Sequence, residues 1–346
     1  MFGYLRFFLA SLVLLSHVDL SVQGANPGVA AVVVFYMLAG FVVCNLFSKV
    51  FVADKPLFFQ FYYERFLRIF PLYLFVLALT ILFLFTTNFG SPKFEFSAML
   101  SNMLIVPLNY FMILDNTILQ EPNWWLIPPA WSLGVELQAY LLLPFIIYYR
   151  NIKIVLGLIS LCIFCAACFG VIHTNYFGYR LLPGVFFIFI LGVCIYNTAS
   201  EKRDADIFDK YFPSFVYIML ILMLIVLGIF RKLLEVYVVE TIIGLLVGIP
   251  VISFLARIRK NIPLNHVLGD LSYGIFLSHF LAIWMVEHFL LVDRLANGYL
   301  YIVVVFSISL LISLLAVFLI EVNIKKYRFY LSKSIQRIGS VETRSA

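Results

Sequence analysis

Charged residues are scarce in this sequence. Only 12% of its 346 residues are Asp, Glu, Lys or Arg, and 64% are apolar, whereas a soluble domain has about 25% charged and 45–50% apolar residues. A water-soluble globule is therefore excluded. The apolar runs also lack the alternation of polar and apolar residues that is typical of a transmembrane β-barrel, so helices must satisfy the backbone hydrogen bonds.

Cysteine is also rare, and metal-binding patterns are missing. All five cysteines lie in apolar stretches with no cluster of His or Asp beside them: Cys44, Cys162, Cys165, Cys168 and Cys194. We expect them to be packing residues, with no disulfide and no metal site. No basic patch interleaved with aromatic residues is present, so we expect no nucleic-acid partner. The net charge of +6 is better explained by membrane orientation.

What the sequence has in abundance is long apolar runs. A helix of about 20 apolar residues crosses the hydrocarbon core of a bilayer. Hydropathy predicts an all-α, polytopic integral membrane protein with about ten transmembrane helices, near residues 5–22, 28–48, 66–86, 131–149, 154–172, 181–198, 212–229, 236–256, 270–291 and 299–320.

The stretch 97–114 is ambiguous, because it is apolar but contains Asn102, Pro107 and Asn109. If it does not span, both termini are cytoplasmic and 19 of the 24 Lys and Arg residues lie inside; if it spans, the two sides carry nine and 15. The positive-inside rule favours the first arrangement. We therefore predict a re-entrant or surface segment over 97–130 on the outer face.

The ends of the chain are assigned in the same way. Residues 1–24 resemble a secretory signal, but a cleaved leader has no use for His17 and Asp19, so we predict a retained first helix. We expect a single transmembrane domain over 1–320 and a short basic cytoplasmic tail over 321–346.

Two ionisable residues share one face of the first predicted helix. Arg6 and His17 are eleven residues apart, which is about 20° past three full turns and roughly 16 Å along the axis. Arg6 is expected at the cytoplasmic surface and His17 within the membrane. The alternative is that Arg6 is a topology anchor and His17 a packing residue. Ionisable residues in spans are costly and commonly functional.

Two further segments carry the same kind of signal. Arg65 and Arg68 lie at i and i+3 on one helix face, where two guanidinium groups can hold a phosphate or can simply set the topology. Glu136 lies near the outer end of a span, with Tyr140 close by, and a carboxylate at that depth needs a partner, a proton or water.

The last such segment contains His279, seven residues after Ser272 and hence nearly on the same helix face. Small and polar residues in that pattern are also typical of helix packing.

Taken in order, these segments resemble the membrane acyltransferase 3 family of O-acyltransferases. The resemblance covers nearly the whole chain and depends on four patterns: Arg6 with His17, Arg65-x-x-Arg68-Ile-x-Pro71, Trp131-Ser-Leu-x-x-Glu136 with Tyr140 and Pro144, and Ser272-Tyr-x-Ile-x-Leu-x-His279. Glu321 also fits an acidic position of the family. Ala39 stands where the family usually has Ser, and Asn323 where it commonly has Pro.

The resemblance implies an enzyme that moves an acyl group, most simply acetyl, from acyl-CoA to a sugar hydroxyl of a surface polysaccharide or its lipid-linked precursor. Acetyl-CoA would be a co-substrate, bound through Arg6, Arg65 and Arg68. His17 would act as general base on the acceptor, or carry the acyl group itself, and Asp19 or Glu136 would orient its imidazole.

The outer segment is the expected acceptor site. Its Trp124 and Trp125 can stack on sugar rings, and we expect the remaining acceptor contacts from Trp131, Ser132, Tyr140 and His279. The other expected partner is membrane lipid, and the expected location is the bacterial cytoplasmic (inner) membrane. The alternative function is a transporter or flippase of a lipid-linked glycan, with the buried ionisable residues forming its pathway.

Overall fold

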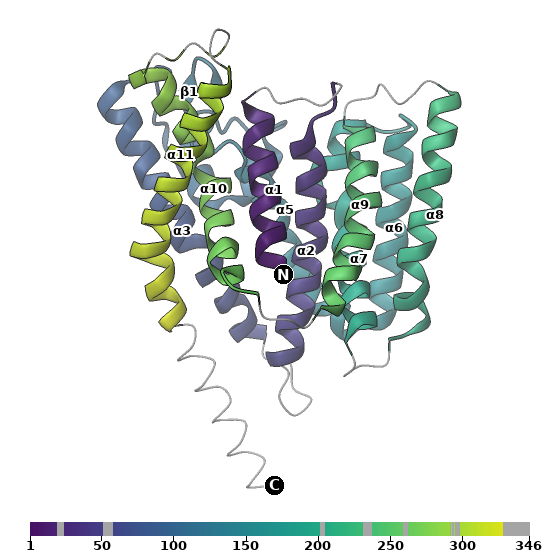
Figure 1. Cartoon of the computed structure of the whole chain (residues 1–346). Coiled ribbons are helices and arrows are strands. Elements are labelled where there is room, and N and C mark those ends of the chain that lie inside the picture. Colours follow the sequence, from purple (N-terminus) through teal and green to yellow (C-terminus); the bar gives the residue numbers. More distant parts are fainter. Residues whose placement is uncertain are drawn as a thin grey trace, which may run out of the picture. The chain divides into compact units, whose positions relative to one another are not determined.

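The computed structural model describes residues 1–18, 24–50, 58–200, 205–230, 237–258, 262–290, 292, 294 and 298–327. Within them the chain is almost entirely helical (Figure 1). The helices are α1 (Phe2–His17), α2 (Pro27–Val50), α3 (Phe58–Thr87), α4 (Phe96–Leu104), α5 (Ala130–Tyr148), α6 (Arg150–Cys168), α7 (Leu182–Ala199), α8 (Ile207–Ile229), α9 (Val238–Arg257), α10 (Asn265–Met285) and α11 (Gly298–Ala316).

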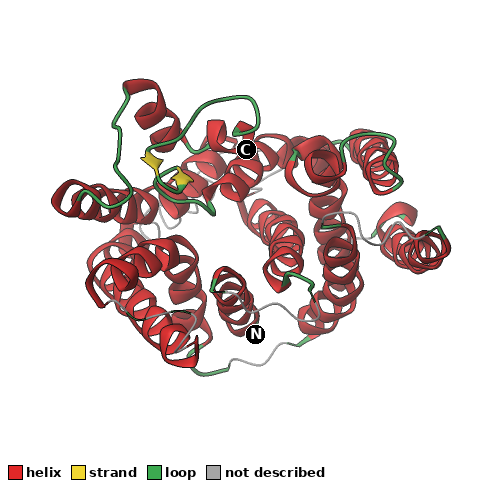
Figure 2. Cartoon of the chain, turned by 90° about the horizontal axis from the view of Figure 1, so that it is seen from above, coloured by secondary structure: helices red, strands yellow, loops and turns green. Residues whose placement is uncertain are grey.

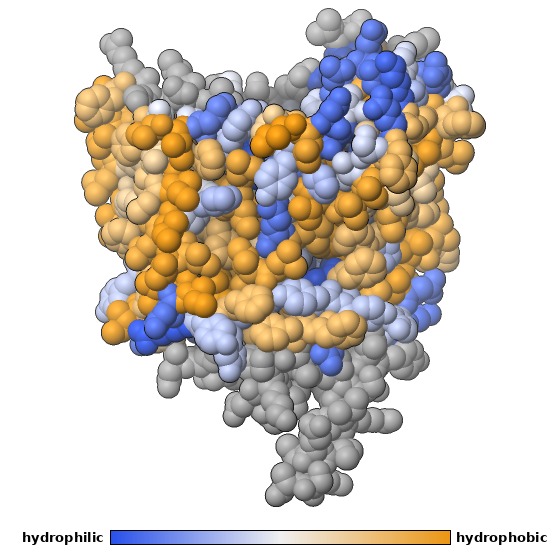
Figure 3. Space-filling view, turned by 180° about the vertical axis from the view of Figure 1, so that it is seen from behind, coloured by the Kyte–Doolittle hydropathy of each residue, from blue (hydrophilic) through white to orange (hydrophobic). Residues whose placement is uncertain are grey.

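Within the described part of the chain, nine helices are long and apolar enough to cross a membrane: α2, α3, α5, α6, α7 with the preceding turn, α8, α9, α10 and α11. They correspond to nine of the ten predicted spans. The first predicted span is the shorter apolar helix α1, which has 16 residues and ends at His17. Figure 3 shows one face of the surface that follows from this composition, on which apolar side chains predominate. The prediction of an all-α polytopic membrane protein is confirmed.

The ambiguous segment is not a spanning helix. Helix α4, with nine residues, and a 3-10 turn (Val106–Tyr110) occupy it, and a short hairpin of β1 (Leu119–Gln120) and β2 (Asn123–Trp124), drawn in yellow in Figure 2, follows within the predicted segment 97–130. The fully buried side chain of Asn102 holds it together, accepting a hydrogen bond from the Leu126 amide (2.8 Å) and donating to the carbonyls of Ala98 and Asn116. Its irregular backbone is therefore satisfied within the protein, as membrane depth requires.

The chain divides into two compact units, each made of two separate stretches. Unit 1 comprises Met1–Asn45 and Trp131–Gly269, and unit 2 comprises Leu46–Ala130 and Asp270–Ala346.

In unit 1, α7 is the central helix and packs against α6, α8 and α9 (Figure 1). Glycines let α2 and α7 approach closely. A β-carbon on Gly40 would lie 1.9 Å from the Phe189 carbonyl oxygen, and one on Gly192 would lie 2.0 Å from that of Met37. Small residues at helix crossings are the usual means of close packing inside membranes, and any larger side chain at either position would separate the two helices.

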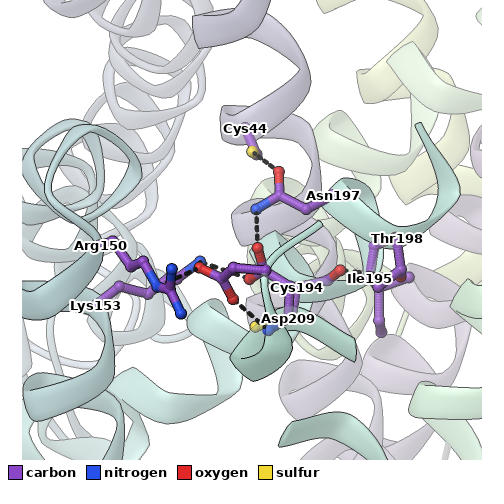
Figure 4. A network of polar contacts seen from close by, with 9 residues as sticks. Cys44, Arg150, Lys153, Cys194, Ile195, Asn197, Thr198 and Asp209 are labelled. Atoms are coloured by element: carbon purple, nitrogen blue, oxygen red, sulfur yellow. Dashed lines mark hydrogen bonds and ion pairs between the residues drawn. The ribbon is translucent and has the colours of Figure 1, made fainter. Parts of the chain in front are cut away.

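A buried polar network joins α2, α6, α7 and α8 at one end of unit 1 (Figure 4). The Lys153 ammonium contacts Asp209 Oδ1 at 2.6 Å and Asp206 Oδ2 at 3.2 Å. The other oxygen of Asp209 accepts a bond from the Asn197 amide (2.9 Å), whose oxygen accepts one from Cys44 Sγ. Lys153 and Asp209 are 4% and 3% exposed, so each charge is neutralised where water cannot do so.

In unit 2, serines and a glycine join α10 to α11. A β-carbon on Gly274 would lie 2.2 Å from Ser313 Oγ, and that hydroxyl donates to the Leu271 carbonyl (2.8 Å). One turn away, the hydroxyls of Ser278 and Ser309 share a hydrogen bond (3.1 Å). Small and polar residues on α10 therefore do serve helix packing.

Candidate functional site

Helix α1 in unit 1 carries both Arg6 and His17. Its start is fixed by the Gly3 amide, which donates to Asn265 Oδ1 (2.9 Å), and its last residue is His17. Both Arg6 and His17 are half-buried. The continuous helix keeps them on one face, about 16 Å apart. The predicted catalytic Asp19 lies outside the described residues.

An apolar cavity of about 560 Å³ also borders α1, lined by Tyr4, Phe8 and residues of and after α9. Tyr4 and Phe8 are each two positions from Arg6, which puts them roughly 160° around the helix from it. The cavity therefore faces away from the Arg6 and His17 side of α1, and its apolar lining suits lipid chains.

Helix α5 brings together the four predicted residues of the Trp131 to Tyr140 segment. Glu136 and Tyr140 lie one turn apart, and the Tyr140 hydroxyl donates a hydrogen bond to the Glu136 carboxylate. Ser132 and Tyr140 are buried, whereas Trp131 and Glu136 are half-buried. The partner that a carboxylate in a span requires is thus supplied by its own helix.

Arg180 is a residue that sequence reasoning missed, having been counted only as an outer charge. Its guanidinium lies 4.5 Å from the ring centroid of Trp131 and 5.6 Å from those of Tyr179 and Tyr237. Its Nε donates to Asn175 Oδ1 (2.8 Å). An arginine among three aromatic faces is held by cation–π attraction and presents a rigid donor fork. The Arg180 cage, as we call these four residues, comes from sequence positions too distant to pair by inspection.

The Arg180 cage and the His17 end of α1 belong to the same end of unit 1. Ser16, beside His17, packs against Gly28 at the start of α2, where a β-carbon would lie 2.2 Å from Ser16 Oγ. The Asn26 amide donates to Glu240 (3.2 Å) in the first turn of α9, and Tyr237 of the cage directly precedes that helix. The start of α9 therefore connects the two.

A buried hydroxyl lies near this cluster. Tyr36 of α2 is 2% exposed, and its hydroxyl has no hydrogen-bond partner within the described part of the chain. It lies within electrostatic range of Arg180 and Glu136. A buried donor without an acceptor is costly, so this hydroxyl is a group that a polar substrate can satisfy.

The predicted phosphate-binding arginines Arg65 and Arg68 lie on α3 in unit 2. Arg65 forms an ion pair with its neighbour Glu64. Arg68 contacts Glu321 at 2.5 Å and Asp270 at 4.0 Å, and Glu321 is only 2% exposed. Arg68 is therefore already paired with a buried carboxylate, and Glu321 positions its guanidinium. From the sequence, Glu321 was noted only because it fits an acidic position of the family.

Three predicted acceptor-binding residues meet in unit 2. Trp124 lies 5.7 Å from Trp125 and 5.5 Å from Phe280, and Phe280 lies 5.1 Å from the fully buried His279, all between ring centroids. His279 Nδ1 also contacts the Ile275 carbonyl at 3.2 Å. The segment 97–130 and α10 thus form one aromatic row, in which Trp124 is half-buried and the other three rings are buried.

No group of three His, Cys, Asp or Glu side chains within the described ranges is arranged to hold a metal ion.

Comparison with known proteins gives two findings. A family model described as an acyltransferase domain matches residues 2–318. A protein of Aquifex aeolicus (strain VF5), itself described only as uncharacterized, is 39% identical over 225 residues, which is 65% of this chain and 98% of that protein. No solved structure matches this chain.

Proposed function

Since this chain belongs to the acyltransferase 3 family of membrane proteins, we propose that it transfers an acyl group, most simply acetyl, from acyl-CoA to a hydroxyl of a sugar. The acceptor is a surface polysaccharide or its lipid-linked precursor, and the location is a bacterial cytoplasmic membrane. Membership of an acyltransferase family favours this reading over a transporter or flippase, because transport requires no acyl transfer.

The observation that carries the proposal is helix α1. One continuous helix from Phe2 to His17 contains a cation near its start and an imidazole at its end. The distance between them, about 16 Å, is comparable to the pantetheine arm that separates the phosphates of coenzyme A from its thioester. Arg6 binds phosphate in this scheme. A phosphate role for Arg65 and Arg68 of unit 2 stays a separate prediction.

His17 is the general base of the proposed reaction. Its neutral imidazole takes the proton of the acceptor hydroxyl as that oxygen attacks the thioester carbon. The tetrahedral intermediate then collapses, the carbon–sulfur bond breaks, and the departing thiolate takes the proton back from the imidazolium. The products are an ester and free coenzyme A. A covalent route through acyl-His17 gives the same products in two steps.

Three further groups of unit 1 have supporting roles in this scheme. The Glu136 carboxylate, held by Tyr140, stabilises an imidazolium electrostatically, as Asp19 would. The Tyr36 hydroxyl and the Arg180 guanidinium are donors suited to an oxyanion or to acceptor hydroxyls.

The test is to incubate the purified full chain, in proteoliposomes that also contain lipid-linked glycan as acceptor, with acetyl-CoA labelled in its acetyl group. An acyltransferase releases free thiol and transfers or retains the label. Absence of both products with acetyl-CoA and longer acyl-CoAs would reject the proposed donor, and glycan movement without them would support the flippase.

A further inference from the structure

The outer segment of unit 2 contains a small cavity beside Trp125. Its volume is about 260 Å³, and its lining includes Phe111, Asp115, Asn116 and Thr117. Sites for drug-sized ligands usually measure about 300–1,000 Å³, so this cavity suits a single small ring and not an extended chain.

Asn116 lines this cavity and carries a buried polar atom that no described residue satisfies. The side chain is 2% exposed, and its Nδ2 donates to the Pro107 carbonyl (3.0 Å). Its Oδ1 is buried and accepts no hydrogen bond from the residues that the structure describes. Because burying an acceptor without a donor costs free energy, a ligand that donates a hydrogen bond here would recover it.

Asp115 adds a second acceptor. Its Oδ1 accepts a hydrogen bond from the Thr117 amide (3.1 Å). Bonds from the Thr117 amide and side chain lower the pKa of the Asp115 carboxyl, so it is ionised at neutral pH. Among the described residues, no Lys, Arg or His lines the cavity. The polar groups that the cavity offers a ligand are thus hydrogen-bond acceptors, one of which is negatively charged.

The cavity wall continues into the aromatic row. The rings of Phe111 and Trp125 lie 5.2 Å apart, and Trp125 contacts Trp124 at 5.7 Å. The Trp125 indole is fixed by a bond from its Nε1 to the Pro128 carbonyl (2.9 Å). A rigid aromatic wall beside two acceptors matches a ring with an apolar face and an edge of hydroxyl or ammonium donors.

We propose that this cavity binds one ring of the acceptor and selects neutral or amino sugars over sugars that carry a carboxylate or phosphate. The inference rests on the proposed function for its link to acyl transfer. An acidic sugar would meet the Asp115 charge and would bring no donor for Asn116 at that position, whereas each hydroxyl or ammonium supplies one.

Binding is measured without turnover, by saturation-transfer NMR on the purified full chain. The probes are methyl glucoside, methyl glucosaminide and methyl glucuronide. We expect the first two to bind and the glucuronide to bind about tenfold more weakly. Asp115→Asn keeps the shape and the bond from Thr117, and it should weaken the glucosaminide about tenfold and strengthen the glucuronide. Glu121→Gln, an exposed acid of the same segment outside the cavity lining, should change neither.

The outcomes separate the two proposals. Equal binding of glucoside and glucuronide, no binding of any probe, or Asp115→Asn behaving like the wild type, would overturn the sugar site. Selective binding by a chain that turns over no acyl-CoA would uphold the sugar site while rejecting the proposed donor.

Discussion

Substitutions of Arg68 can distinguish a structural role of this residue from a role in binding the donor. Arg68→Met removes the guanidinium that lies 2.5 Å from a Glu321 carboxylate of 2% exposure. Breaking a buried ion pair from one side costs about 3–5 kcal/mol, and since the Arg68 side chain is 20% exposed, we expect about 3 kcal/mol. Replacing both residues, as in Arg68→Met with Glu321→Leu, should return the unfolding free energy to within about 1 kcal/mol of the wild type.

The assay pairs this stability with donor kinetics. Unfolding is followed in mixed micelles of increasing SDS content, and the Michaelis constant for acetyl-CoA is measured on the same preparations. If Arg68 binds a donor phosphate, both variants raise that constant about tenfold although only the single variant is unstable. Lys325→Met, which removes a 41% exposed cation from the same cluster, should cost under about 1 kcal/mol. A double variant with wild-type stability and wild-type donor affinity would refute the phosphate role, and a stable single variant would refute the ion-pair argument.

Three further predictions concern unit 1. Asp209→Asn removes the charge paired with buried Lys153 and should lower the unfolding free energy by about 3–5 kcal/mol in the same SDS titration. Gly192→Val puts a β-carbon 2.0 Å from a carbonyl oxygen of α2 and should destabilise by about 1–3 kcal/mol, whereas Gly298→Ala, with open space around it, should be nearly neutral. Burial opposes ionisation of Asp206, but the Asp209 amide and the Lys153 ammonium outweigh it and lower its pKa. The ionised Asp206 therefore stabilises the folded state fully above about pH 5. This contribution to the unfolding free energy is lost as the pH falls below 3.8, the pKa of the carboxyl in the unfolded chain, and through the lowered pKa of the folded state. Asp206→Asn should flatten that dependence in pH-resolved unfolding.

Much of the fold could be predicted from the sequence, because transmembrane helices are recognised by their length and their apolar composition. The segment 97–130 was the difficult case, and charge counting excluded a span there. The structure gives the local reason. The Asn102 side-chain amide makes hydrogen bonds to irregular backbone at Asn116 and Leu126. The backbone of a spanning helix would need no such bonds, because it satisfies its own groups. The early end of α1 at His17 was not predicted, since hydropathy alone does not mark the last turn of a helix.

The site was predictable where its residues share one helix. Arg6 with His17, and Glu136 with Tyr140, follow from helical spacing alone. The Arg180 cage was not predictable, because Trp131, Tyr179 and Tyr237 meet only through the packing of unit 1. For the same reason, the sequence did not reveal that Arg68 is held by Glu321, 253 residues away.

The account depends most directly on the imidazole of His17. Transfer of labelled acetyl from acetyl-CoA should be compared between the wild type, His17→Ala and the matched control His173→Ala, an exposed histidine of the same unit. We expect His17→Ala to lower turnover by about 10²–10⁴-fold with unchanged folding, and His173→Ala to keep wild-type turnover. Near-normal transfer by a folded His17→Ala variant would contradict the proposed mechanism.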